Sequence, residues 1–211
     1  MEIKKVNLKE QTYNLIKDRI LSRHYKLGES LKISRLSEEL NISNTPIRES
    51  LSYLESEGLV EFLGGKYSVI NLGAKEILQL NHAVLVNILA ALDIVVAEDK
   101  IEDLIELEKI SLENQKELKS KDATINFEFI KTYVEFNRNI VLAADNKFLL
   151  KTFDNLFSIL ILATSYNKKV YMDIHYNLHL EIYNALLEKD YEKIRTTLKE
   201  LFNKDETSFE L

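Results

Sequence analysis

The stretch that decides the fold runs Leu31-Lys-Ile-Ser-Arg-Leu-Ser-Glu-Glu-Leu-Asn-Ile-Ser-Asn-Thr-Pro-Ile-Arg-Glu-Ser-Leu-Ser-Tyr-Leu-Glu-Ser-Glu-Gly-Leu59. It reads as two short helices, 34–40 and 45–57, joined by a polar turn. The only proline of the chain, Pro46, stands where the second helix begins. Proline is tolerated in the first turn of a helix, and Thr45 ahead of it is suited to be the N-cap. The pattern predicts a helix-turn-helix.

The second helix of this stretch has a buried side and a polar side. Ile47, Leu51 and Leu54 fall at i, i+4 and i+7, which predicts one buried stripe. The side chains left facing outward at its start are Asn44, Thr45, Arg48 and Glu49. A short helix that presents amide, hydroxyl and guanidinium groups from its N-terminus is suited to read base edges in the major groove of DNA.

One more predicted helix and a predicted hairpin flank this stretch. Residues 8–23 have the apolar spacing of an amphipathic helix. Residues 59–63 and 66–70 are β-prone and surround Gly64-Gly65, a strong signal for a two-residue hairpin turn. Three helices followed by a hairpin form a winged helix. We therefore assign residues 1–72 to a winged helix-turn-helix domain.

From residue 73 the pattern changes to helix after helix without a strand signal. The predicted helices are 74–97, 100–119, 123–144, 147–166, 169–188 and 190–205. Asp122 and Asp190 precede two of them and are candidate N-caps. Helices joined by such short turns form antiparallel bundles. The predicted fold class is mostly α, with an antiparallel bundle of six or seven helices over residues 73–211.

Composition and charge agree with this division. Apolar residues make up 45% and charged residues 29% of the 211-residue chain, as in ordinary globular proteins. The absence of cysteine excludes disulfides and thiolate metal sites. The net charge of −6 divides into +1 for residues 1–72 and −7 for the remainder, which fits a DNA-facing domain followed by an acidic one. DNA binding needs only a local basic face, so the excess of one positive charge in residues 1–72 is weak evidence for it.

Two features concern where the protein is found. The N-terminal residues 1–5 lack the apolar core of a signal peptide. The most apolar runs, 84–97 and 156–163, are too short or too interrupted by charge to span a bilayer, so we expect them to be buried helices. These features predict a cytoplasmic protein without a membrane partner.

The first domain resembles a known family. Ser43-Asn-Thr-Pro-Ile-Arg-Glu-Ser-Leu51 and Leu54-Glu-Ser-Glu-Gly-Leu-Val60 are similar to the signature of GntR-type bacterial transcription regulators. The family's segments read Ser-Arg-Thr-Pro-Val-Arg-Glu-Ala-Leu and Leu-x-x-Glu-Gly-Leu-Val. The second domain resembles the FCD-type effector domain of the FadR subfamily, through Phe136-Asn-Arg138, Asn146 and His179-Leu-Glu-Ile-Tyr-Asn-Ala-Leu186.

The resemblance implies a set of DNA-contacting residues. The set is Ser43, Asn44, Thr45, Arg48, Arg35, Gly65 and Lys66. We expect the hydroxyl groups to contact phosphates and Arg48 to contact a phosphate or a guanine edge. The family usually has arginine where this chain has Asn44. We therefore expect Asn44 to read an adenine of the operator, where an arginine would read a guanine.

The resemblance also bears on metal binding. Many relatives hold a divalent metal through an aspartate, a histidine one turn later and two further histidines. The corresponding positions here are Tyr133, Asn137, His179 and, approximately, Leu201. Since His179 is the only retained ligand, we expect no metal cofactor. An arginine and a glutamate of the family are also replaced, at about Asn87 and Ala91, which argues against a small carboxylate as the effector.

Polar and aromatic residues of the second domain suggest an effector pocket. The predicted lining is Tyr133, Asn137, Arg138, His179 and Tyr183. Each of these residues is also an ordinary candidate for structural packing. His175 and His179 have the i, i+4 spacing of a two-histidine metal site, but no third ligand stands in obvious register, so we favour pocket lining for His179.

No catalytic motif is present. The sequence lacks a cysteine nucleophile, Gly-x-Ser-x-Gly and a phosphate-binding glycine loop. We predict a regulator, a repressor, that binds a palindromic double-stranded operator as a homodimer and responds to a small molecule. The alternative left open is a helical ligand-binding or protein-interaction module whose winged helix does not read DNA.

Overall fold

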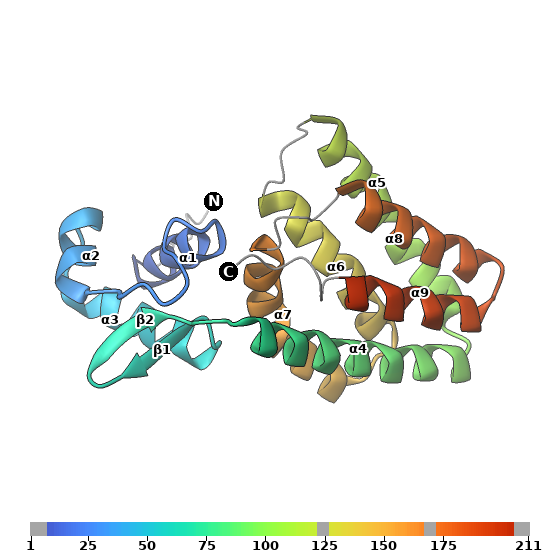
Figure 1. Ribbon diagram of the computed structural model, residues 1–211, viewed down its shortest axis with the longest axis horizontal. Helices are drawn as coiled ribbons and strands as arrows, with labels where there is room; N and C mark the ends of the chain where they lie inside the picture. The colour runs from blue at the N-terminus through green and yellow to red at the C-terminus, as the bar shows by residue number, and fades with distance from the viewer. Residues whose placement is uncertain (1–7, 122–126, 167–171, 205–211) are drawn as a thin grey trace, which may run out of the picture. The chain divides into compact units, whose positions relative to one another are not determined.

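The computed structural model describes residues 8–121, 127–166 and 172–204. The chain divides into two compact units, Met1–Leu72 and Gly73–Leu211. The elements of the first unit are α1 (Leu8–Leu21), α2 (Ile33–Leu40), α3 (Asn44–Ser56), β1 (Val60–Leu63) and β2 (Lys66–Val69) (Figure 1). The elements of the second are α4 (Ala74–Ala97), α5 (Ile101–Lys121), α6 (Phe127–Ala143), α7 (Lys147–Ser165), α8 (Met172–Leu187) and α9 (Tyr191–Lys204). The predicted cap Asp122 and the predicted helix starts at 123 and 169 lie outside the described residues.

The first unit is the predicted winged helix. α1, α2 and β1 all pack on α3. The predicted stripe of α3, Ile47, Leu51 and Leu54, is fully buried. Because this stripe is buried within the unit, α3 presents its other side, with Asn44, Arg48 and Glu49, to solvent.

The start of α3 differs from the prediction. Ser43, not Thr45, is the N-cap, with extended backbone angles (φ −63°, ψ 160°), and Thr45 lies inside the helix. Pro46 is therefore the third helical residue. The prediction was wrong because none of the first three N–H groups has a partner within the helix, so proline fits each of these positions equally well.

The end of α3 and the wing follow from glycines with positive φ. Gly58 (φ +73°) ends α3 in a Schellman arrangement, in which the Leu59 N–H donates to the Leu54 carbonyl (3.0 Å). Gly64 and Gly65 (φ +58° and +78°) form the turn of the predicted β1–β2 hairpin.

A third short segment joins the wing on the other side of β2. Ser30 forms an antiparallel bridge with Ser68, and the Leu31 N–H donates to the Tyr67 carbonyl at 2.8 Å. The sequence did not predict this strand because a single bridge requires no alternation of apolar residues. The segment ties the base of the wing to the chain that enters α2.

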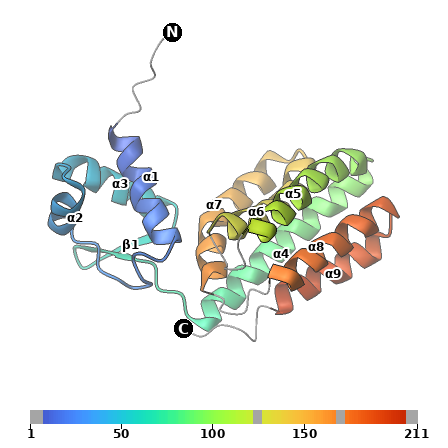
Figure 2. The same ribbon diagram turned by 90° about the horizontal axis from the view of Figure 1, so that it is seen from above.

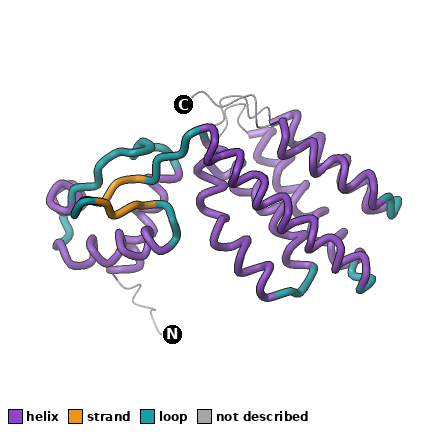
Figure 3. The backbone as a smooth tube through the Cα atoms, turned by 60° about the horizontal axis from the view of Figure 1, so that its bottom comes forward, coloured by secondary structure: helices purple, strands orange, loops and turns teal. Residues whose placement is uncertain are grey.

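The second unit is a bundle of six helices in its described part (Figure 2). α6 contacts α4, α5 and α7, and α4 also contacts α9, which pairs with α8. Short loops join the helices where the structure describes them (Figure 3). As predicted, Asp190 caps α9, because its Oδ1 accepts from the Lys193 N–H (3.0 Å). Asn146 caps α7 in the same way, with Oδ1 accepting from Phe148 and Leu149 (3.1 and 3.2 Å).

Candidate DNA-binding face and effector-domain interior

The start of α3 presents polar groups to solvent. Ser43, Asn44, Thr45 and Arg48 are all exposed. The Ser43 hydroxyl makes no capping hydrogen bond to the first N–H groups of α3. A helix start of this kind offers backbone donors and hydroxyl groups to an anion such as a phosphate.

Charge pairing within the first unit distinguishes its cations. Three cations of α1 are paired with carboxylates: Lys9 with Glu49, Lys17 with Glu57, and Arg19 with Glu39. Arg35 is 65% exposed and lies 3.7 Å from Glu29. Arg48 and Lys66 form no ion pair among the described residues. Lys26 and Lys32, in the segment before α2, are likewise without an ion pair among the described residues. Unneutralised charge on α3 and on the wing therefore comes from Arg48 and Lys66.

The wing has an apolar edge in addition to Lys66. Leu63 is 68% and Phe62 46% exposed, and the Phe62 ring packs on Tyr67 with 4.5 Å between centroids. Gly65 lies in the turn, exposed, with the positive φ that its predicted role requires. A narrow turn of two glycines lets the backbone approach a groove closely.

His179 lies in the interior of the second unit. It is fully buried, and its ring stacks on Phe136 (3.9 Å between centroids, 6° between planes) and on Tyr133 (4.9 Å, 17°). Its Nδ1 lies 3.0 Å from Gln115 Oε1. Burial, with a smaller effect from His175, lowers the pKa of His179 well below its usual value. The ring is therefore neutral at pH 7.

Asn137 is fully buried one helical turn beyond Tyr133. Its Nδ2 donates to the Tyr133 carbonyl (3.1 Å). Within the described part of the chain, neither Asn137 Oδ1 nor His179 Nε2 has a hydrogen-bond partner. Buried polar atoms in this state are rare in folded proteins.

The interior also contains two polar residues that the sequence analysis missed, Glu108 and Gln115 on α5. Both are fully buried, and Glu108 Oε2 accepts from Asn139 Nδ2 (3.2 Å). Burial raises the pKa of the Glu108 carboxyl well above its usual value, against the lowering effect of Asn139. The two residues are seven apart and share a stripe with Leu104 and Leu112, a spacing that was available in the sequence.

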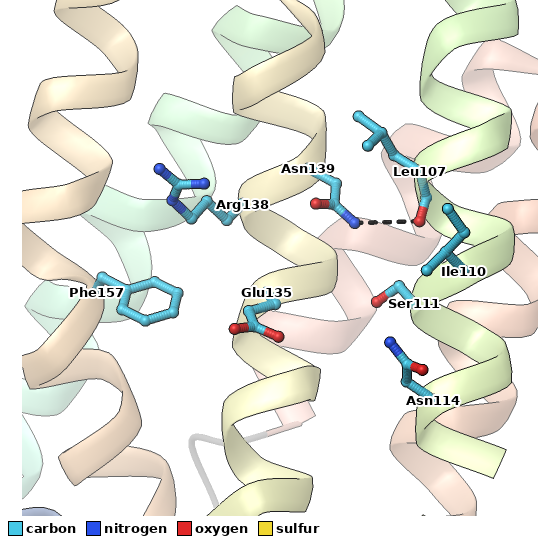
Figure 4. A pocket seen from close by; sticks show the side chains of 8 residues that line it. All are labelled: Leu107, Ile110, Ser111, Asn114, Glu135, Arg138, Asn139 and Phe157. Carbon is cyan, nitrogen blue, oxygen red and sulfur yellow. Dashed lines mark hydrogen bonds between the residues drawn. The ribbon is translucent and has the colours of Figure 1, made fainter. Parts of the chain in front are cut away.

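The structure divides the predicted effector residues between the interior of the bundle and an outer groove. Tyr133, Asn137 and His179 face the interior, and Tyr183 is half-buried one turn beyond His179 on α8. Arg138 instead lies in an outer groove of about 390 Å³ between α5, α6 and α7 (Figure 4). There its guanidinium donates two hydrogen bonds to Asp154 (2.6 and 3.1 Å). Residue 138 is about 100° further round the helix than residue 137, which explains the separation.

Comparison with known proteins establishes the family. The model of the gntR family of bacterial regulatory proteins matches residues 8–70, and the FCD domain model matches residues 89–204. The chain is a GntR-family transcription regulator with an FCD domain. The family model describes bacterial regulatory proteins.

Relatives of this GntR regulator support the assignment. An uncharacterized HTH-type transcriptional regulator, YdhC of Bacillus subtilis, is 28% identical over 140 residues, which are 66% of this chain and 62% of that protein. The structure of E. coli McbR/YncC has a TM-score of 0.68 at 21% identity, with 95% of each chain covered. A transcriptional regulator GntR of Rhodococcus sp. RHA1 has a TM-score of 0.70 at 15% identity, covering 94% of this chain and 95% of that one. The structural matches show a shared fold.

The family's divalent metal does not fit the residues present in this regulator. At the aspartate position, the Tyr133 ring lies flat against His179 and edge-on to His175, 4.7 Å between centroids. Leu201, at the last histidine position, is buried and has no ligand atom. No three acidic, histidine or cysteine side chains gather in the described residues. One imidazole and one amide oxygen are a poor donor set for a transition metal.

Proposed function

We propose that this GntR regulator binds a palindromic double-stranded operator as a homodimer. Binding represses transcription, and a small molecule in the FCD domain changes operator affinity. As a chromosomal DNA binder it would act in the cytoplasm, without a membrane partner or a metal cofactor. One winged helix makes few base contacts, which favours a dimer on two half-sites.

The exposed start of α3 carries the DNA-binding proposal. Arg48 has no carboxylate partner among the described residues, whereas the cations of α1 are paired within the unit. Burying an unpaired guanidinium against DNA breaks no ion pair in the protein. We propose that Arg48 binds a phosphate or a guanine edge and that Asn44 reads an adenine. Ser43 and Thr45 would bind phosphates, and Arg35, Gly65 and Lys66 would add contacts to the backbone and the minor groove.

A selection from random duplexes tests this proposal. The wild-type protein should enrich a palindromic motif, with affinity that falls steeply as salt rises. Arg48→Ala should weaken binding to that motif by about 1–3 kcal/mol, or roughly 5- to 150-fold. Lys9→Ala is the matched control, because it removes one positive charge from the same unit at a cation already paired with Glu49. Equal affinity of Arg48→Ala and wild type would show that α3 is not the reading helix.

The alternative function, a protein-interaction module, predicts a different result from the same selection. Such a module would enrich no DNA motif at any salt concentration. The exposed apolar edge of the wing, Phe62 and Leu63, is the observation that keeps this alternative open.

An uncovered apolar face on α4 and α7 supports the homodimer. The sequence expectation for the two apolar runs was wrong: the helices that contain them are long and apolar enough to cross a membrane by length and composition. Less than half of each apolar window is buried within one chain, so these helices are not the fully buried ones expected. α4 has no Asp, Glu, Lys or Arg from Ile77 to Leu92. Val86 on α4 and Phe148 on α7 are 54% and 71% exposed. A second copy of this chain would cover these side chains, and α4 and α7 already lie in contact.

A further inference from the structure

We infer that the effector of this FCD domain donates hydrogen bonds, through an ammonium, hydroxyl or amide N–H group, to His179 Nε2 and Asn137 Oδ1. This inference rests on the proposed effector-binding role of the domain. It adds the chemical class of the ligand and the two protein atoms that select it.

The hydrogen bonds around His179 determine which ring nitrogen carries the proton. Gln115 Nε2 donates to the Thr132 carbonyl (3.3 Å), and a carbonyl accepts only. Gln115 therefore directs its oxygen at His179 Nδ1, which lies 3.0 Å away and must be the N–H. A neutral imidazole has one such proton, so His179 Nε2 presents a bare lone pair.

A hydrogen bond also fixes the orientation of the Asn137 amide. Its Nδ2 faces the Tyr133 carbonyl at 3.1 Å, so its Oδ1 is the free end of the amide. Like His179 Nε2, this oxygen is fully buried and has no hydrogen-bond partner in the part of the chain that the structure describes. Both atoms are acceptors, and neither rotation of the amide nor a tautomer change supplies a donor without breaking an existing hydrogen bond.

The two acceptors lie on helices that pack together, α6 and α8. Tyr133 and Phe136 stack on the His179 ring, and Asn137 follows Phe136 directly and lies one turn beyond Tyr133. Native proteins match buried acceptors with donors from the protein, from water or from a ligand. A carboxylate or phosphate would instead place its own lone pairs against these two atoms, and the −7 charge of residues 73–211 disfavours an anion further.

Nitrogen-15 NMR of the full-length protein tests the inference at the atom concerned. The probes are propylamine, 1-propanol and propionate, which have similar size and differ in whether the head group donates. The amine or the alcohol should shift the His179 Nε2 resonance, as expected when a bare imidazole nitrogen accepts a hydrogen bond, and propionate should not. Asn137→Leu should weaken binding of the donor roughly three- to tenfold, as for one lost hydrogen bond. Asn155→Leu, at an exposed asparagine of α7, should not. The exposed His24 and His82 report nonspecific effects in the same spectrum.

Three results would overturn the inference: propionate binding as tightly as the donors, His179 carrying its proton on Nε2 in the free protein, or no shift with either donor. Operator binding is measured separately on the same samples. If the protein binds its operator and neither donor moves the Nε2 resonance, the regulator function stands and the ligand class is wrong. If operator binding is absent but a donor still shifts the Nε2 resonance, the ligand class stands and the proposed DNA-binding function is wrong.

Discussion

Glu108 gives the sharpest stability test of the bundle. It is fully buried on α5, and its one hydrogen bond in the described structure comes from Asn139. The raised pKa means that the folded protein keeps a proton that the unfolded chain releases above about pH 4.3. Stability from this group is therefore complete below that pH and is lost as pH rises toward the folded pKa.

Glu108→Gln removes the titration and keeps the shape, since a glutamine oxygen also accepts from Asn139. Over the pH range in which the folded state holds the proton and the unfolded state does not, each rise of one pH unit should destabilise wild type. The loss is about 1.4 kcal/mol of unfolding free energy relative to Glu108→Gln. For a domain of this size that is a relative fall in Tm of roughly 3–6 °C per pH unit. The variant should be more stable than wild type at pH 7.

Thermal and denaturant unfolding of the full chain at several pH values between 4.5 and 7.5 measures this difference. Glu106→Gln is the matched control, because Glu106 is exposed on the same helix and its loss should leave the pH dependence unchanged. If Glu108→Gln and wild type differ by the same free energy at every pH, Glu108 ionises freely in the folded protein. The assignment of a neutral, buried carboxyl would then be wrong.

Three further perturbations test other parts of the structure. Val86→Glu should yield monomers in sedimentation analysis. Ile110→Glu, at an equally exposed apolar residue of α5, should remain dimeric. If Val86→Glu is also dimeric, the dimer interface does not include this face of α4. Asn146→Ala should lower stability by about 1 kcal/mol through loss of the α7 cap, and Asn155→Ala on the same helix should be neutral in denaturant unfolding. Zn²⁺ or Ni²⁺ should leave the Tm unchanged, and a saturable rise would show that the two buried histidines of α8 bind metal.

Local rules in the sequence were sufficient for the elements of the fold. The two glycines at 64 and 65 require positive φ, which specifies a hairpin turn whatever surrounds it. The apolar spacing of Ile47, Leu51 and Leu54 likewise specified the buried side of α3, and the outer side followed by exclusion. Family signature residues lie in these same local patterns, so the DNA-binding assignment was also available from the sequence.

Contacts between distant residues decided the rest. The sequence does not say which cations are neutralised. Lys9, Lys17 and Arg19 pair with carboxylates 20 to 40 residues away, and only the structure shows these pairs. Glu108 shares a helical stripe with Leu104 and Leu112, but α5 is rich in acidic and basic residues, and the packing of α6 and α8 on α5 shows that this carboxyl is buried. Helical spacing says which residues share a face, but the neighbouring helices determine which faces are covered and which polar atoms keep a partner. The sequence therefore determined the family and the winged helix, and tertiary packing determined which charges are paired and which polar atoms are buried.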